Sequence, residues 1–182
     1  MNLNTKRITL VGILAAMSAI LYIFPTFPIL PAFSWLEIDF ADIPALLVSV
    51  LVHPVVGAAV VLIRNIIHLP VSSTGMVGEL SNFLISACFV FFAGVLFRVF
   101  SKGKTASFKH VALSMPIAIV LQVIAAVLCN KYIMLRVFPI PAGASEYILM
   151  GVVPFNIIKT VISSALFLVV YKALIPKIKR YI

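Results

Sequence analysis

Long apolar stretches, separated by short polar or proline-rich connections, make up most of the chain. A helix needs roughly 20 apolar residues to cross the hydrocarbon core of a bilayer, and the chain has room for six spans. Five of the stretches are residues 8–24, 42–53, 78–100, 110–132 and 147–171; the third in order follows a tight turn expected at Pro54–Gly57 and runs to about Leu69. The second and third are short for a span, so we expect them to be tilted, interrupted or shielded by neighbouring helices. The pattern predicts an all-α integral membrane protein with six transmembrane helices, folded as a single domain over residues 1–182.

A proline-rich segment follows the first stretch. Pro25, Pro28 and Pro31 would break a helical hydrogen-bond ladder, so residues 25–41 are predicted to form a long loop between the first and second helices. The sequence Asp42-Ile-Pro44 is typical of a helix start, where the acid faces free N–H groups and proline costs no hydrogen bond. No small-x-small cleavage site follows the first stretch, which indicates a span rather than a signal peptide.

Composition argues against a water-soluble domain, and the placement of charges gives an orientation. Of the 182 residues 63% are hydrophobic, and the mean hydropathy is +1.22, so the lipid bilayer is the expected surrounding. The net charge of +9 therefore indicates topology and not nucleic-acid binding. Basic residues gather before the first stretch, after the fourth and at the end: Lys6, Arg7, Arg98, Lys102, Lys104, Lys109, Lys172, Lys177, Lys179 and Arg180. All five acids lie at or near the other connections, so both termini are predicted to be cytoplasmic and the 25–41 loop to lie outside.

Polar side chains within the spans are the candidate chemistry, because each is costly against lipid unless it faces protein, water or ligand. Lys159 lies near the middle of the sixth stretch, where insertion of a lysine costs roughly 2.5–3.5 kcal/mol. Asn156 and Ser163 lie on the same helical face. No acid lies at the depth of Lys159 in the predicted spans, which favours a lysine in a binding pocket. The alternative is a lysine neutralised by an internal acid or by helix carbonyls.

Further polar positions lie on the fourth and fifth stretches. Glu79, Asn82 and Ser86 share one face of the fourth helix, which indicates either a pocket wall or a polar seam between helices. Asn130, near the outer end of the fifth stretch, is placed to join Asn156, Lys159 and Asn82 in one pocket.

Three other polar residues of the spans have structural interpretations. Arg64 and His68 are four apart on the third stretch, and pairing with Glu79, Asp39 or Asp42 is at least as consistent with the pattern as ligand contact. Gln122 is predicted to form a hydrogen bond between helices.

A pocket of amides and one cation within apolar and aromatic walls suits a neutral, flat ligand with a polar edge. The sequence holds no catalytic motif and no repeated filter sequence, and Cys88 and Cys129 lack metal-ligand spacing. We therefore expect neither an enzyme, a metal site nor a channel. Small residues at Ala15 and Ala19 predict a groove where another helix, from a partner or from this chain, approaches closely.

At these residues the chain resembles the S components of energy-coupling factor (ECF) transporters, and within them the riboflavin-specific subfamily. The resemblance covers essentially the whole length. Its motifs open the second stretch, end the third, open the fourth and lie in the sixth: Asp39–Leu47, Arg64–Leu69, Gly78–Phe83 and Pro154–Lys159. Ala15 and Ala19 match the family's AxxxA docking motif. The chain departs from the family at Asn130-Lys131-Tyr132, where a lysine is inserted, and in a shorter outer segment before the sixth stretch.

The resemblance implies a six-helix S component that binds riboflavin from outside as transported ligand, without a cofactor. It would join a transmembrane coupling protein (T component) and two ATPases in a bacterial cell membrane. The family's flavin-contacting residues fall on Asn130, Asn156 and Lys159, and the predicted substrate-binding set also includes Asn82, Glu79 and Asp39. Whether these last three contact ligand or only pack helices is left open. The alternatives are an S component for another planar vitamin or nucleobase-like compound, and a stand-alone carrier or membrane enzyme.

Overall fold

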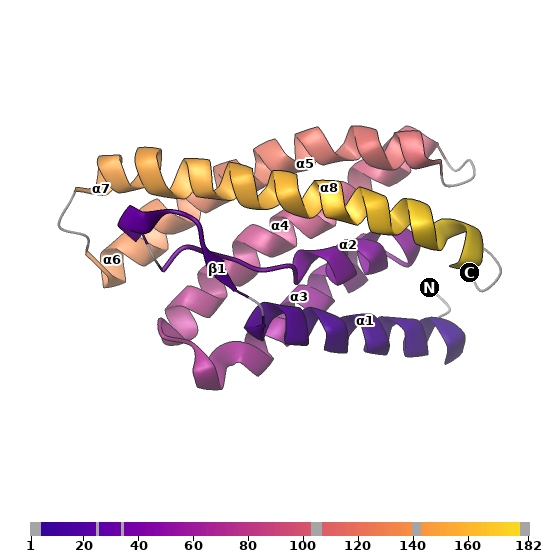
Figure 1. Cartoon of the computed structure of the whole chain (residues 1–182), viewed down its shortest axis with the longest axis horizontal. Helices are drawn as coiled ribbons and strands as arrows, with labels where there is room; N and C mark the ends of the chain where they lie inside the picture. Colours follow the sequence, from indigo (N-terminus) through magenta and orange to yellow (C-terminus); the bar gives the residue numbers. More distant parts are fainter. Residues whose placement is uncertain (1–4, 25, 34, 103–106, 140–142, 179–182) are drawn as a thin grey trace.

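The computed structural model describes residues 5–24, 26–33, 35–102, 107–139 and 143–178. It is an elongated bundle in which α1 begins, and α8 ends, at the same end (Figure 1). We call this the basic end, because the segments of the chain that begin or end there carry most of the basic residues: Lys6, Arg7, Arg98, Lys102, Lys109 and Lys172. Of the residues used in the sequence analysis, Pro25, Lys104, Lys179 and Arg180 lie outside the described part. The shared end agrees with termini on one side of the membrane, while their cytoplasmic placement stays a prediction.

Six helices form the bundle: α1 (Thr5–Ile23), α2 (Asp42–Leu51), α3 (Pro54–His68), α4 (Gly75–Ser101), α5 (Phe108–Cys129) and α8 (Val153–Ile178). Short turns extend three of them. A 3-10 turn, η2 (Leu69–Val71), follows α3; the π-helix η3 (Asn130–Met134) and α6 (Leu135–Val137) follow α5; α7 (Ala144–Glu146) and the π-helix η4 (Tyr147–Val152) lead into α8. Within the described residues, five of these segments are long and apolar enough to cross a membrane, and α2 is not.

Helix α2 is half a span, shielded by its neighbours. Eight of its residues are buried, and it packs against α1, α3, α4 and α8. A helix that is surrounded by protein is hydrophobic on nearly all of its faces, which explains why this stretch is apolar except for Asp42 and Ser49. Shielding by neighbours, one of the explanations left open for this short stretch, is what the structure shows. The turn expected at Pro54–Gly57 is wrong, because α3 begins at Pro54, where a first-turn proline costs no hydrogen bond.

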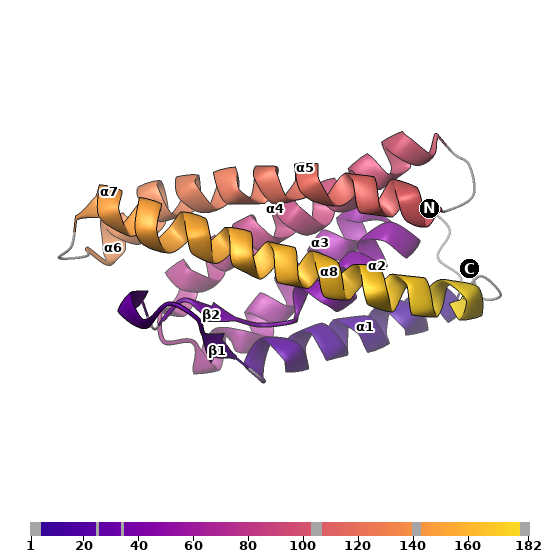
Figure 2. The ribbon, with the colours of Figure 1, turned by 45° about the horizontal axis from the view of Figure 1, so that its top comes forward.

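The loop before α2 is folded against the bundle. It forms a small hairpin in which β1 (Phe27–Pro28) pairs antiparallel with β2 (Glu37–Ile38), and the 3-10 turn η1 (Pro31–Phe33) lies between them. Figure 2 shows the hairpin lying along the bundle between α1 and α8. Non-helical backbone at membrane depth is tolerated where protein surrounds it or where it lines a cavity. The hairpin therefore brings loop residues into the bundle interior.

Close contacts fix the basic end of α2. A Cβ added at Gly57 of α3 would lie 2.6 Å from the Ser49 Cβ, so only glycine lets the two helices approach this closely. The Ser49 hydroxyl donates to the Val90 carbonyl at 2.6 Å. Arg98 of α4 donates to the carbonyls of Ser49 and Val52 at 2.9 and 3.0 Å. The guanidinium thereby binds carbonyls that the end of a helix leaves without partners.

Helix α1 turns Ala15 and Ala19 toward the bundle. Ala19 is buried and Ala15 packs against the main hydrophobic core, while Gly12, Ala16 and Ile20 face outward. Packing within this chain, one of the two alternatives for the small-residue groove, therefore accounts for both alanines in this structure. Partner docking at these two positions stays a prediction.

Candidate functional site

A cavity of about 240 Å³ lies between the hairpin and helices α1, α4, α5 and α8. All six residues of the predicted substrate-binding set line it: Asp39, Glu79, Asn82, Asn130, Asn156 and Lys159. They come from four separate segments of the chain, the hairpin, α4, η3 and α8, so the cavity exists only in the folded bundle. Aromatic side chains of Tyr22, Trp35, Tyr147 and Phe155 complete its walls.

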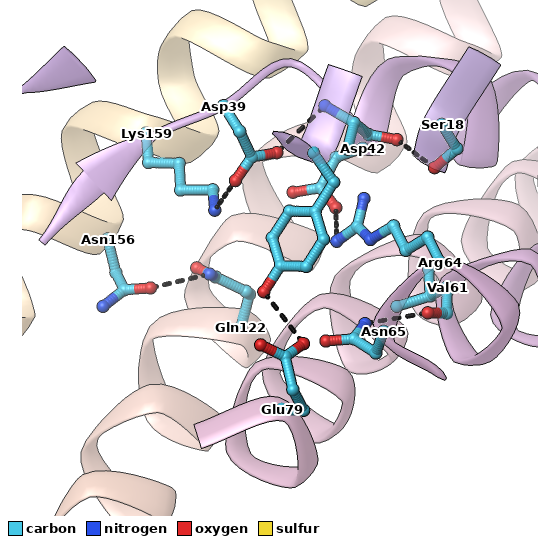
Figure 3. Close-up of polar contacts among 12 residues, drawn as sticks. Ser18, Asp39, Asp42, Val61, Arg64, Asn65, Glu79, Gln122, Asn156 and Lys159 are labelled. Carbon is cyan, nitrogen blue, oxygen red and sulfur yellow. Dashed lines mark hydrogen bonds and ion pairs between the residues drawn. The ribbon is translucent and has the colours of Figure 1, made fainter. Parts of the chain in front are cut away.

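Lys159 is neutralised by an acid. Its Nζ donates to the Asp39 Oδ2 at 2.7 Å, and both side chains are about one-twentieth exposed, 6% and 4%. The expectation that no acid lies at the depth of Lys159 is therefore wrong, because the hairpin carries Asp39 into the bundle from a segment read as an outer loop (Figure 3). Burial alone would raise the pKa of Asp39, but the charges of Lys159 and Arg64 and the Ala41 N–H lower it below its ordinary value.

Two amides from facing helices form a row beside this ion pair. Gln122 of α5 donates through Nε2 to the Asn156 Oδ1 at 2.9 Å, and Asn156 donates to the Val152 carbonyl at 2.7 Å (Figure 3). The prediction that Gln122 bonds between helices is confirmed, and the residue also lines the cavity. Within the described part of the chain, Gln122 Oε1 and Asn82 Oδ1 are buried and accept no hydrogen bond. Both oxygens are thus free for a donor on a ligand.

Asn130 lies in the cavity wall. The π-helix η3 begins at Asn130, and single π turns within helices are frequent at functional sites. Tyr147, the first residue of η4, donates its hydroxyl to the Asn130 Oδ1 at 3.2 Å. The two irregular turns therefore meet at the cavity and hold the amide there.

The polar stripe on α3 is used in contacts with acids. Arg64, fully buried, donates to the Asp42 Oδ1 at 2.7 Å behind the cavity. The His68 Nδ1 lies 2.8 Å from the Glu79 Oε1. Pairing with acids, one alternative left open for these two residues, is therefore what the structure shows. His68 also lines the cavity.

Tyr22 is the residue that sequence reasoning missed. Its hydroxyl donates to the Glu79 Oε2 at 3.3 Å, and its ring lies 4.4 Å from the His68 ring. Tyrosines near the end of a membrane helix are common at the lipid interface, so the sequence carried no signal that set this one apart.

The lining of the cavity is suited to binding a ligand without net charge. Over the described residues, no group of three or more His, Cys, Asp or Glu side chains is placed to hold a metal ion. Amide donors and acceptors face a space walled by aromatic rings, and the lysine charge is matched by Asp39. This arrangement suits a flat ligand with polar edges and no net charge.

Comparison with known proteins identifies relatives over nearly the whole chain. The riboflavin transporter RibU of Staphylococcus aureus is 29% identical over 97% of this chain and 94% of its own length. The riboflavin transporter FmnP of Bacillus subtilis is 27% identical over 98% of this chain and 96% of its own. A solved S component of a bacterial ECF transporter superposes with a TM-score of 0.79 at 30% identity, covering 96% of this chain and 98% of that one.

The fold, the cavity and these relatives agree with a family model. The model for the substrate-specific component of ECF transporters matches residues 6–171, which includes every helix that lines the cavity. The chain is therefore a membrane transport subunit and not an enzyme: it belongs to the family of ECF transporter substrate-specific (S) components.

Proposed function

We propose that this chain is the riboflavin-binding S component of an ECF-type vitamin importer. The observation that carries the proposal is that relatives named riboflavin transporters align over 97% and 98% of the chain. The alternative is an S component for another planar vitamin or nucleobase-like compound. The chemistry of the cavity favours the flavin.

The isoalloxazine ring of riboflavin is flat and apolar over its faces, and one edge alternates carbonyl oxygens with ring nitrogens. The aromatic walls, Trp35, Tyr147 and Phe155, suit the faces of such a ring. The amides of Asn130, Gln122 and Asn156 suit the edge, because an amide both donates and accepts. Lys159 adds a donor whose charge is balanced by Asp39.

Transport needs partners that supply energy. The sequence contains no P-loop of its own, and an S component implies a T component and two ATPases. The membrane in question is the bacterial cell membrane, with both termini cytoplasmic and the hairpin facing outward. Ala15 and Ala19 stay the proposed docking residues; in this structure Ala19 is buried and Ala15 is half-buried against the main hydrophobic core.

An absorption spectrum of the detergent-purified protein, expressed in a flavin-replete host, tests the ligand class. We expect a bound flavin band at close to one flavin per chain, and quenching of riboflavin fluorescence by protein freed of ligand. A colourless preparation that leaves riboflavin fluorescence unchanged would refute the flavin assignment. It would leave membership of the S-component family intact.

A further inference from the structure

A second hollow of about 140 Å³ lies on the other side of α4, between α3 and α4. Most of its lining is apolar, and Leu62, Ile66 and Leu80 in its walls are exposed. Exposed apolar side chains that gather on one face of a membrane protein are in contact with lipid. This hollow, which we call the α3/α4 groove, therefore opens toward the bilayer and not toward water.

The groove lies near the end of the bundle opposite the basic end. Helix α4 has 27 residues and is about 40 Å long, with Gly75 at the far end from the basic residues. Asn65 is three residues before the end of α3, and Glu79 is four residues after the start of α4, so both lie about 4–6 Å inside the helix ends. A 40 Å helix spans the hydrocarbon core and both headgroup layers. Asn65 and Glu79 therefore lie close to the level at which lipid headgroups begin.

Asn65 brings an acceptor without a donor to this groove. The side chain is 3% exposed, and its Nδ2 donates to the Val61 carbonyl at 2.8 Å. Its Oδ1 is buried and has no hydrogen-bond partner among the described residues. In Figure 3 this oxygen points to the side on which Glu79 lies. Since a buried amide oxygen is costly without a donor, a donor that reaches it from the groove would be bound favourably.

Glu79 lines the groove as well as the substrate cavity. It differs from Asp39 and Asp42, the other buried acids of the described residues, which each pair with a permanent cation, Lys159 and Arg64, at 2.7 Å. The partners that the structure gives Glu79 are a histidine ring and a tyrosine hydroxyl. A carboxylate has about four acceptor positions, so about two of them stay open. The groove wall thus combines an acid that has no permanent cation with an unpaired amide oxygen.

Two acceptors, one of them an acid, specify the chemistry of the occupant. A primary ammonium group matches them, because it carries a positive charge and three N–H donors. A trimethylammonium group has the same charge and no donor, and an anionic headgroup would be repelled by the carboxylate. The apolar walls suit an acyl chain. A zwitterionic phospholipid that ends in a primary ammonium meets all of these conditions.

We propose that the α3/α4 groove binds a phospholipid of the phosphatidylethanolamine type. Its ammonium donates to the Glu79 carboxylate and to the Asn65 Oδ1, and an acyl chain lies along Leu62, Ile66 and Leu80. The inference rests on the membrane placement of the chain and not on the flavin assignment. Because Glu79 also lines the substrate cavity, the lipid would hold one wall of that cavity from the membrane side.

Competition between two lipids with the same acyl chains tests the proposal. The detergent-purified protein is mixed with equal amounts of dioleoyl phosphatidylethanolamine and dioleoyl phosphatidylcholine, and native mass spectrometry measures the ratio bound. We expect wild type to prefer the ethanolamine lipid by at least about 10-fold, since hydrogen bonds to charged groups are lost with the other lipid. The N-monomethyl and N,N-dimethyl lipids, which lose one and two donors, should fall between these two. Asn65→Leu and Glu79→Gln should each reduce the preference to below about 3-fold.

Matched variants separate the groove from general damage. Gln122→Leu removes another buried amide, one that lines the substrate cavity and not the groove, and Glu146→Gln removes an exposed acid. Both should keep the wild-type lipid preference. Leu80→Trp fills the groove from its exposed side without changing a buried polar atom, and should also abolish the preference. Cooperative thermal unfolding in phosphatidylcholine checks that each variant is folded.

Three results would overturn the proposal. Equal binding of the two lipids by wild type would mean that no site reads the ammonium. A preference that survives Asn65→Leu, Glu79→Gln and Leu80→Trp would place the lipid site elsewhere. Loss of the preference in Gln122→Leu or Glu146→Gln as well would mean that it follows from the general state of the protein and not from this groove.

Discussion

Loss of Asp39 leaves the Lys159 charge without its partner inside the bundle. The two charged atoms are 2.7 Å apart and the side chains are 4% and 6% exposed, so the pair belongs with buried ion pairs and not with surface ones. Removing one member of a buried pair costs about 3–5 kcal/mol, whereas an exposed pair contributes about 0–1 kcal/mol. For a chain of this size 1 kcal/mol moves Tm by about 2–4 °C. We therefore expect Asp39→Asn to lower Tm by about 6–20 °C.

Thermal unfolding of the ligand-free protein in detergent measures the effect, and a double-mutant cycle assigns it to the pair. Lys159→Met should also destabilise, because it leaves the Asp39 carboxylate unpaired. The double variant should recover to within about 1–2 kcal/mol of wild type, because replacing both members of a buried pair is often close to neutral. Lys109→Met, at an exposed lysine, is the matched control and should stay within about 0.5 kcal/mol. If the losses of unfolding free energy in the two single variants simply add in the double variant, the reasoning is refuted.

Three further predictions follow from the same structure. Because the pKa of Asp39 lies below its ordinary value of 3.8, its contribution to stability is complete above that pH and is lost only as pH falls through the lower pKa of the folded state; a loss of stability above pH 5 that Asp39→Asn removes would contradict this. Gly57→Ala should destabilise by about 1–3 kcal/mol, since the new Cβ would lie 2.6 Å from the Ser49 Cβ, while Gly12→Ala, where nothing lies within 4 Å, should be neutral or stabilising. Arg98→Met should cost at least about 2 kcal/mol in thermal unfolding, because it strips donors from the carbonyls at the end of α2; an unchanged Tm would show that these carbonyls find other donors.

The polar residues of the cavity could be predicted because lipid makes them costly. Lys159, Asn156 and Asn82 lie within apolar helices. Polar side chains in such helices nearly always face the interior of the bundle, so the sequence alone predicts that these three do so. All six candidate residues do line one cavity. Their contact with ligand stays a prediction, since cavity lining alone does not establish which of them bind.

The partner of Lys159 could not be predicted, because depth in the membrane was inferred from helix boundaries. Asp39 is 120 positions away and follows a proline-rich segment, so the sequence pattern placed it at the surface. Only the hairpin fold, with α2 beginning part of the way into the bundle, brings it to Lys159. The π-helices were missed for a related reason: a five-residue turn has no hydrophobic periodicity of its own to distinguish it within a long apolar helix.

The length of α2 also bears on how the protein enters a membrane. Ten residues of helix extend about 15 Å, half of a hydrocarbon core of about 30 Å, so a translocon that selects full-length spans would pass over this segment during synthesis. It packs against α8, which is made well after it, as well as against α1, α3 and α4. We expect α2 and the hairpin to settle into the bundle after the other helices have inserted. A cysteine placed at Ala45, fully buried in the complete chain, should react with a polar thiol reagent in a chain truncated before α8 and resist it in the full chain. The cavity would then form late, completed only after α8 has been made.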